Sequence, residues 1–435
     1  MTMYFIILFN LLVYLAGWLF VWVKGLRSHV VFAFSWFIFT IYYFLTPLYF
    51  YAQGRATIWG DQGAFLGVGE NILAYYDEGF LYFGFASLSF LIGYFFIRHR
   101  EFVQVNIQSK FSKSLLFGLF GACFFLVILN FILSGVNPIE VLTGNSEETL
   151  FNAKGGSNYL KNFADSLVTC LVIGFLIKMD RRFWFLFVIV SFVLFAMMGF
   201  RYRIIMTVIG ILLLILFNYR FSFKRIFAPL ALFLVILYMI LFLTINRYNL
   251  IVGDLKNLVY NPIEYEIGST LAEQTRGALD DINIIKYYHT HPNPKHDNGI
   301  TFFYFIVRAL PRALIGDYKN KLYPPPAFPI VDEAYNLPLA WSATGEAPLH
   351  YAYFIIAGGF WFLIIGTFLT GLILRFTTVN RNYHHPKQKI FLVILCMALF
   401  QWYTRGYFPQ FVDHLVFLWI PYWLYFRFNT NEKIS

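Results

Sequence analysis

Charged residues are scarce in this chain of 435 residues, and their scarcity excludes an ordinary water-soluble domain. Asp, Glu, Lys and Arg make up 13% of the sequence, whereas a soluble domain carries about 25%. Hydrophobic residues make up 59% and aromatic residues 22%, including 54 Phe and 30 Tyr. No fold in water could bury so much apolar surface. We therefore expect lipid to surround most of the chain, with part of the aromatic side chains at the membrane interfaces.

Cysteines and common catalytic motifs are also rare or absent. The three cysteines, Cys123, Cys170 and Cys396, lie in apolar runs without CxxC spacing, which predicts buried free thiols and neither a disulfide framework nor a zinc site. The sequence has no P-loop, GxGxxG, GxSxG or HExxH pattern, so nucleotide-driven transport and zinc proteolysis have no support. The stretch HTHPNPKHD at 289–297 holds three histidines, but Pro and Asn separate them and we expect no metal there.

Long apolar runs are what the sequence has instead. A membrane helix requires roughly 20 predominantly apolar residues. By this criterion we predict spans at residues 3–23, 29–51, 79–97, 114–134, 159–177, 183–199, 204–218, 226–245, 347–374, 390–404 and 411–427. The predicted fold is thus an all-α polytopic membrane protein with about 11 transmembrane helices and one long extracytoplasmic loop that contains short helices. Its parts are 1–245 with the first eight helices, 246–346 as a loop or cap over the membrane face, and 347–435 with the last three helices and a cytoplasmic tail.

Lysines and arginines predict the orientation. More than half of the 33 lie in alternate connectors or the C-terminal tail: Lys24, Arg27, Arg98, Arg100, Lys110, Lys113, Lys178, Arg181, Arg182, Arg220, Lys224, Arg225, Arg375, Arg381, Lys387, Lys389, Arg427 and Lys433. The positive-inside rule makes these segments cytoplasmic, which places the N-terminus outside and the C-terminus inside. The net charge of +10 then reflects orientation, and we expect no nucleic-acid partner. The run 300–310 would make the number of spans even if it inserted, but it is short and Arg308 interrupts it, so we predict an interfacial helix.

Arginines that fall at membrane depth are the first candidates for a functional site. Residues 183–218 are apolar except for Arg201 and Arg203 in GFRYRI, and two ordinary spans would require about 40 residues. The turn between them should therefore lie against the outer leaflet. An arginine at a helix centre costs about 2.5 to 3.5 kcal/mol on insertion scales. Either these side chains reach lipid phosphates, or their planar guanidinium groups bind a fixed anionic group.

Three further arginines are predicted at the same membrane face. Arg405 lies in the outward turn YTRGYFPQ, where the alternative is an ion pair with Asp413. Arg247 marks the start of the long loop, where the alternative is an ordinary interfacial anchor. Arg312 belongs to the basic stretch 308–323, which could equally be a solvated face. Together with the GFRYRI turn these arginines would form a cationic site whose natural ligand is a phosphate or pyrophosphate on a lipid.

Glu346 and His350 are the candidates for a general base. They lie four residues apart in WSATGEAPLHYAYFIIAGG, and they would share one face if the segment is helical. A carboxylate or imidazole beside an arginine site suits the removal of a proton from an acceptor hydroxyl. The alternative is a hydrogen bond between the two that only shapes the loop.

These motifs together resemble those of the Wzy-type oligosaccharide repeat-unit polymerases, which include the O-antigen and enterobacterial common antigen polymerases. The likeness covers roughly residues 185–425. It matches Arg201 to the arginine of a Gly-x-Arg turn, Arg405 to a late Arg-Gly turn, Arg247 to the basic residue at the loop start, and Gly358 with Gly359 to the small-residue end of the Ser/Thr-Gly-Glu helix. The sequence departs from the pattern at Tyr202 and Arg203, and at Asp317 and Tyr318, where a Trp-Pro-like pair is common.

The resemblance implies a metal-independent, inverting glycosyltransferase of GT-C type without a cofactor, in the bacterial cytoplasmic (inner) membrane. It would transfer a growing glycan from undecaprenyl pyrophosphate to another undecaprenyl-pyrophosphate-linked repeat unit at the periplasmic face. Its partners would be that lipid-linked oligosaccharide, membrane lipid and a chain-length regulator. The alternatives are an O-antigen ligase or another lipid-linked glycan transferase, and a lipid-linked oligosaccharide flippase. A flippase needs polar residues along a path through the membrane, whereas the charges here cluster at one face.

Overall fold

A computed structural model describes most of the predicted helices of the chain. The described residues are 3–58, 71–97, 107–109, 111–134, 158–198, 202–218, 238, 242, 255–260, 272–273, 275–310, 316, 321–322, 324–335, 348–379, 381, 383–429 and 432–434.

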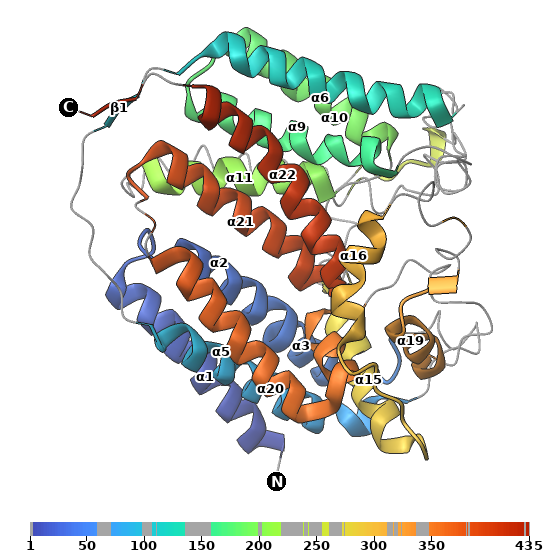
Figure 1. Ribbon diagram of the computed structural model, residues 1–435. Coiled ribbons are helices and arrows are strands. Elements are labelled where there is room, and N and C mark those ends of the chain that lie inside the picture. Colours follow the sequence, from blue (N-terminus) through green and yellow to red (C-terminus); the bar gives the residue numbers. More distant parts are fainter. Residues whose placement is uncertain are drawn as a thin grey trace. The chain divides into compact units, whose positions relative to one another are not determined.

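Helices make up almost all of the described chain (Figure 1). The helices within the predicted apolar runs are α1 (Met3–Lys24), α2 (Val30–Phe39), η1 (Thr40–Leu45), α3 (Thr46–Ala52), α5 (Tyr76–Phe95), α6 (Lys113–Ser134), α9 (Asn158–Leu176), α10 (Arg181–Met197), α11 (Tyr202–Asn218), α20 (His350–Val379), α21 (Pro386–Arg405) and α22 (Phe408–Phe428). The short π-helix η1 joins α2 to α3 within one predicted span. The predicted span at 226–245 lies largely outside the described residues.

Six helical segments in the described residues are long and apolar enough to cross a membrane. They are Met3–Lys24, Val30–Ala52, Leu73–Phe95, Lys113–Leu133, Tyr159–Leu176 and His350–Val379. The apolar helix at 202–217 is shorter. The prediction of an α-helical, polytopic membrane protein is thus confirmed, while the total of eleven spans stays a prediction.

The chain divides into two compact units. The first comprises Met1–Glu101, Leu271–Arg381 and Ala398–Asp413, and the second comprises Phe102–Thr270, Asn382–Met397 and His414–Ser435. The helices α21 and α22 each contribute to both units.

The first unit is built on a close contact between α5 and α20, with α1 against the other side of α5. Glycines allow this approach. A Cβ at Gly93 would lie 2.1 Å from the carbonyl oxygen of Phe368, and a Cβ at Gly371 would lie 2.2 Å from that of Phe90. Small residues let helix backbones pack closely where lipid provides no hydrophobic drive for association. The backbones of α5 and α20 are therefore in direct contact at two levels.

The ends of α1, α5 and α20 that the charge pattern predicts to be cytoplasmic lie together. Arg375, near the end of α20, donates from Nε to the carbonyl oxygen of Ile97 at 3.0 Å, and its Nη1 lies 3.4 Å from Nδ1 of His29. The predicted cytoplasmic connectors after α1 and α5 thus meet the predicted cytoplasmic end of α20. The opposite ends of α3 and α5 meet residues of the long loop, as described below. Which end faces the cytoplasm stays a prediction.

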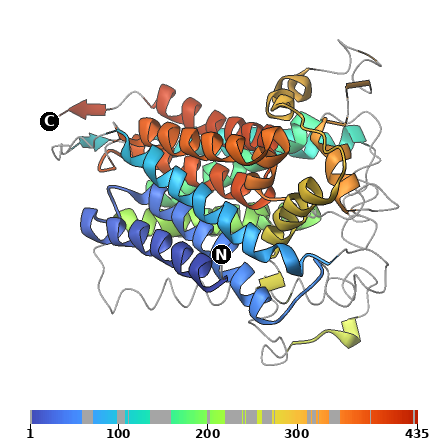
Figure 2. The same cartoon turned by 90° about the horizontal axis from the view of Figure 1, so that it is seen from below.

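The described part of residues 246–346, the predicted long loop, contains short helices. The segment η3 (Leu255–Asn257) belongs to the second unit. The helices α15 (Gly277–Thr290), η5 (Ile300–Phe303), α16 (Tyr304–Ala309) and α19 (Ala327–Tyr335) belong to the first unit, and we call them the cap. Within the first unit, α15 packs against α20 and against α5, which follows the short η2 (Leu73–Tyr75), and Figure 2 shows α15, in yellow, beside the start of α5. The segment Ile300–Ala309 is a short apolar helix, and Phe303 and Ile306 expose more than half of their side chains. Its length and exposed apolar face agree with the predicted interfacial helix.

The second unit contains α6, α9, α10 and α11, with parts of α21 and α22. The helix α9 packs against α6, α10 and α11. Two short strands, β1 (Ile107–Ser109) and β2 (Glu432–Ile434), pair in an antiparallel manner with Ile107 opposite Ile434. The connector before α6 and the C-terminal tail therefore lie together, which agrees with their predicted location on one side of the membrane.

Candidate functional site

The start of α20 is held by a buried carboxylate of the cap. Asp281 of α15 accepts hydrogen bonds from the backbone N–H groups of Leu349, at 2.7 Å, and Ala352, at 3.2 Å. The first N–H groups of a helix have no partner within the helix, and they carry the positive end of its dipole. Burial raises the pKa of Asp281 well above its usual range, although the two backbone hydrogen bonds act in the opposite direction. The carboxyl group of Asp281 thus supplies the buried acceptor oxygens that orient the start of α20.

The turn that carries Arg405 packs directly against this helix start. Gly406 has a φ of +67°, and a Cβ there would lie 2.4 Å from the carbonyl oxygen of Pro348 and 2.7 Å from the carbonyl carbon of Leu349. Only glycine fits both the left-handed conformation and the close approach. Arg405 itself is exposed. Two motifs that are distant in sequence, the Arg-Gly turn and the segment leading into α20, are therefore in contact.

His350 lies beneath this contact and is closed off from solvent. Its side chain is 1% exposed, and its Nδ1 lies 3.0 Å from the Tyr43 hydroxyl. The rings of Phe39, Tyr351 and Tyr403 have centroids 5.3, 4.5 and 4.7 Å from the imidazole. A general base must come within hydrogen-bond reach of the hydroxyl that it deprotonates. This burial gives His350 a part in the packing of the core, and its predicted role as a general base stays a prediction.

Asp413 is neutralised by an arginine other than the one considered in the sequence. Arg308 donates from Nε at 2.8 Å and from Nη2 at 2.7 Å to the same oxygen of Asp413, across 105 residues of sequence. The guanidinium of Arg308 also lies over the ring of Tyr407, 5.6 Å from its centroid. The alternative of an Arg405–Asp413 ion pair is therefore wrong. The interfacial helix α16 is instead tied to the start of α22.

The predicted span at 347–374 is broken near its outer end. Gly359 has a φ of +73° and Gly358 is also non-helical, so α20 consists of two helical segments. The carbonyl oxygen of Ile356, at the end of the first segment, accepts the backbone N–H of Asp297 at 3.1 Å and lies 3.3 Å from Nδ1 of His296. Irregular backbone at such depth requires protein partners for its freed polar groups. The cap provides those partners.

The three histidines of the cap do not converge. Nε2 of His289 lies 2.5 Å from Glu78, and Nε2 of His291 lies 2.9 Å from Glu333, while His296 faces α20. Among the described residues, no group of three or more His, Cys, Asp or Glu side chains could hold a metal ion. These histidines instead fasten the two ends of the cap.

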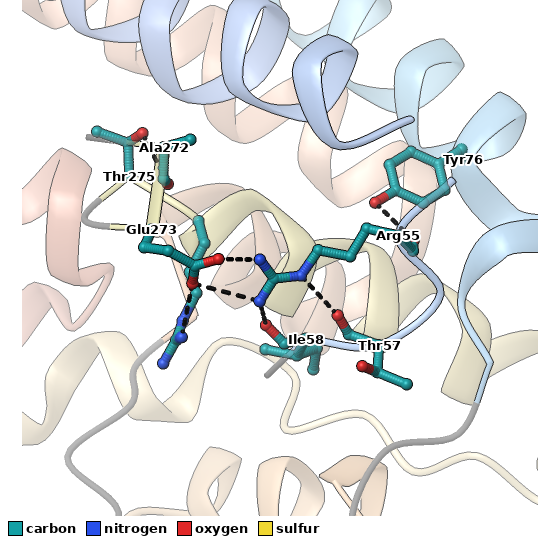
Figure 3. Close-up of polar contacts among 8 residues, drawn as sticks. Arg55, Thr57, Ile58, Tyr76, Ala272, Glu273 and Thr275 are labelled. Atoms are coloured by element: carbon teal, nitrogen blue, oxygen red, sulfur yellow. Dashed lines mark hydrogen bonds and ion pairs between the residues drawn. The ribbon is translucent and has the colours of Figure 1, made fainter. Parts of the chain in front are cut away.

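A partly exposed arginine, Arg55, joins the cap to the segment after α3 (Figure 3). Arg55 forms an ion pair with Glu273, and it donates from Nε to the carbonyl oxygen of Thr57 at 3.0 Å. Arg276 donates to the other oxygen of Glu273 at 2.9 Å. The hydroxyl of Tyr76 donates to the backbone oxygen of Arg55. One carboxylate thus joins Arg55, after α3, to Arg276, at the start of α15.

Arg203 lies in the second unit, and its position differs from the prediction. Its Nε donates to Asp165 of α9 at 2.6 Å, and the other oxygen of Asp165 lies 2.5 Å from Nδ1 of His414 on α22. Arg203 and Asp165 expose 1% and 0% of their surfaces. A guanidinium that a buried carboxylate already neutralises is a poor ligand for pyrophosphate. The structure thus shows Arg203 in an internal ion pair, and its pyrophosphate-binding role stays a prediction.

Four predicted site residues, Arg201, Arg247, Arg312 and Glu346, lie outside the described residues, and their roles stay predictions. The helix α20 begins at His350. The prediction that Glu346 and His350 share one face of a helix is therefore not supported. Two acidic residues were missed. A lone Asp165 in an apolar run could have been found because a charge at membrane depth is costly, whereas nothing local to Asp281 indicates that it caps a helix 68 residues later.

No protein-family model matches the sequence, and neither the curated proteins nor the solved structures contain a match. The class of the protein consequently follows from its own architecture. It is a polytopic α-helical membrane protein in which residues of α15 and of the segment after it are hydrogen-bonded to the broken helix α20.

Proposed function

We propose that the protein is a polysaccharide repeat-unit polymerase. It transfers a growing glycan from undecaprenyl pyrophosphate to another undecaprenyl-pyrophosphate-linked repeat unit at the periplasmic face of the bacterial inner membrane. A chain-length regulator is its expected partner. The proposal adopts the inverting, metal-independent glycosyltransferase mechanism that the sequence resemblance implies.

The contact between the Arg405 turn and the start of α20 is the observation that supports the proposal most. Gly406 brings the turn that carries the exposed Arg405 against Pro348 and Leu349, and Asp281 of α15 holds the same helix start. Both segments belong to the resemblance, although more than fifty residues separate them. An exposed cation beside an ordered cap, at the ends of apolar helices, suits a ligand whose anionic group lies at the level of lipid head groups.

The chemistry of the transfer explains the need for arginine. When the glycan leaves undecaprenyl pyrophosphate, the bond between its anomeric carbon and the pyrophosphate oxygen breaks, and negative charge develops on that oxygen. A guanidinium fixed at this point stabilises the charge as it develops, and its planar fork can hold two phosphate oxygens. We assign this role to Arg405, together with Arg201, Arg247 and Arg312. The acceptor hydroxyl attacks from the opposite face of the sugar, which inverts the anomeric configuration.

The position of His350 favours a polymerase over an O-antigen ligase. A ligase of this architecture would depend on a reactive histidine in the loop, whereas His350 is enclosed by aromatic rings. The charges also gather at helix ends and in the cap, and a flippase would need polar groups along the membrane path.

Deletion of the gene distinguishes these functions in the source bacterium. Loss of a polymerase leaves a single repeat unit on the lipopolysaccharide core, while loss of a ligase leaves bare core. Complementation with Arg405→Ala should lower polymer synthesis at least about 100-fold at wild-type protein level. Arg405→Lys should recover only part of it, because lysine keeps the charge and loses the fork. The same pair at Arg201 tests the residue that the resemblance marks most strongly. Wild-type chain length with Arg405→Ala would remove this residue from the mechanism.

A further inference from the structure

A π-helix interrupts the apolar helical segment that runs from Val30 to Ala52. It is η1, Thr40–Leu45, and its wider turn is closed by the backbone N–H of Thr46, which donates to the carbonyl oxygen of Ile41 five residues earlier. Such turns are rare, and they are frequently found at functional sites. The transfer mechanism proposed above gives this segment no role.

One side of η1 supports the start of α20. The hydroxyl of Tyr43 accepts the backbone N–H of Tyr351 at 3.2 Å and lies 3.0 Å from Nδ1 of His350. One turn earlier, the rings of Phe39 and Tyr403 have centroids 4.8 Å apart. In a regular α-helix a row of residues spaced by four rotates by about 40° at each step. The wider π turn reduces this rotation, so that Tyr43 stays on the same side as Phe39.

Tyr42, the preceding residue, lies beside Arg405 within the first unit. The helix α21 ends at Arg405, two residues after Tyr403. The guanidinium of Arg405 is close enough to the phenol group of Tyr42 to interact with it electrostatically. Tyr42 is partly exposed and Arg405 is exposed, so a ligand can reach both side chains from the surface. Among the described residues, none forms a hydrogen bond with the Tyr42 hydroxyl.

A tyrosine hydroxyl beside an arginine suits the binding of a phosphate group. The phenol and the guanidinium both donate hydrogen bonds, and the oxygens of an ionised phosphate only accept them. Neither side chain has to change its protonation, because a tyrosine keeps its proton up to about pH 10 and an arginine is always charged. A pyrophosphate spreads its acceptor oxygens over two phosphorus atoms. Two donors from different helices can therefore bind it at the same time.

We propose that Tyr42 binds the pyrophosphate group of the lipid-linked donor together with Arg405, an inference that rests on the proposed polymerase function. The Tyr42 hydroxyl donates a hydrogen bond to a phosphate oxygen beside those that Arg405 binds. The π-helix η1 presents Tyr42 to this ligand while Tyr43 keeps its contacts at the start of α20. The hydrogen bond strengthens as negative charge develops on the leaving pyrophosphate, so Tyr42 favours the transition state as well as the bound donor.

Tyr42→Phe tests this role with little structural change, because it removes the hydroxyl and keeps the ring. Purified full-length protein in phosphatidylcholine nanodiscs is titrated with undecaprenyl pyrophosphate, with undecaprenol, which lacks the phosphates, and with inorganic pyrophosphate, which lacks the lipid. We expect the Kd of Tyr42→Phe for undecaprenyl pyrophosphate to rise roughly 10-fold or more. The Kd for undecaprenol should stay at the wild-type value. In proteoliposomes, kcat/KM for glycan elongation should fall by at least the same factor.

Tyr49→Phe is the matched control. Tyr49 is a partly exposed tyrosine about two turns later in the same apolar helical segment. Tyrosines at a membrane surface commonly anchor helices, and a general effect of losing such a hydroxyl would appear in both variants. The Kd of Tyr49→Phe should stay at the wild-type value. A folded Tyr42→Phe variant with the wild-type Kd would overturn the inference, as would an equal loss in Tyr49→Phe. Binding of inorganic pyrophosphate without binding of undecaprenyl pyrophosphate would also overturn it, because the ligand would then be a soluble anion.

Failure of the inference differs from failure of the proposed function. If wild-type protein binds undecaprenyl pyrophosphate through Tyr42 but does not elongate the lipid-linked glycan, the polymerase proposal fails and the binding role of Tyr42 stands. If wild-type protein elongates the glycan and Tyr42→Phe binds and elongates equally well, the polymerase stands and only the role of Tyr42 is refuted.

Discussion

Replacement of Asp281 tests whether the cap holds the broken helix α20. Asp281→Ala leaves the backbone N–H groups of Leu349 and Ala352 without their acceptor. A hydrogen bond to a charged group contributes about 1.5 to 3 kcal/mol, and relief from burying the carboxylate offsets part of the loss. We expect a net loss of about 3 kcal/mol, or roughly 5 °C in Tm. Asp281→Asn keeps one acceptor oxygen and should lose about 1 kcal/mol.

Intrinsic fluorescence of the 10 tryptophans in detergent micelles measures this prediction. Both variants are compared with the wild type at one scan rate, because membrane proteins commonly unfold irreversibly. If Asp281→Ala unfolds at the wild-type temperature, the carboxylate does not hold the start of α20. A larger loss for Asp281→Asn than for Asp281→Ala would equally refute the reasoning.

The pH dependence of stability tests the same carboxylate. Burial raises the pKa of Asp281 in the folded protein. When the pH rises above the usual Asp pKa of about 3.9, Asp281 loses its carboxyl proton in the unfolded chain but keeps it in the folded protein. The free energy of unfolding therefore falls until the pH passes the raised pKa of the folded protein. Asp281→Asn has no such proton. The Tm of the wild type should therefore decline relative to that of Asp281→Asn as the pH rises from about 4. A relative gain by the wild type would indicate a lowered pKa.

Three further substitutions test the packing around the site. Gly406→Ala should abolish polymer synthesis by displacing the Arg405 turn. Gly54→Ala is the control and should not, because Gly54 has a similar positive φ of +65° but no atom within 4 Å of an added Cβ. Equal polymer lengths in the two variants would refute the role of the turn. Gly371→Ala should destabilise the α5–α20 contact by about 2 kcal/mol or more, whereas Gly118→Ala should change Tm little, as thermal unfolding will show. His350→Asn should retain polymer synthesis, and loss of synthesis by folded protein would restore this residue as a base.

Hydropathy predicted the membrane helices well because a helix surrounded by lipid must consist largely of apolar residues. Ten of the eleven predicted runs contain helices in the structure. The short interval at 183–218 yields two helices of 17 residues each, α10 and α11, in agreement with a tight turn between them. The segment Ile300–Ala309 is a short apolar helix, as its length and its single arginine predicted, and its location at the interface stays a prediction.

Ion pairing was far harder to predict, because partners in a helical bundle are set by tertiary packing. Asp413 pairs with Arg308 and not with the nearer Arg405. Arg203 finds Asp165 on α9, 38 residues away. The sequence offered Asp413 as an internal partner but did not indicate Arg308, and it did not indicate that Asp165 would meet Arg203, because these partners are set by the packing of helices.

Reconstitution of the purified protein tests the polymerase assignment most directly. The full chain is placed in liposomes with undecaprenyl-pyrophosphate-linked repeat units extracted from the deletion strain, and the products are separated by length. We predict a ladder of glycans that differ by one repeat unit, each still attached to the lipid pyrophosphate, together with released undecaprenyl pyrophosphate. Unchanged single repeat units in the presence of folded wild-type protein, or transfer only to added lipid A core, would contradict the assignment.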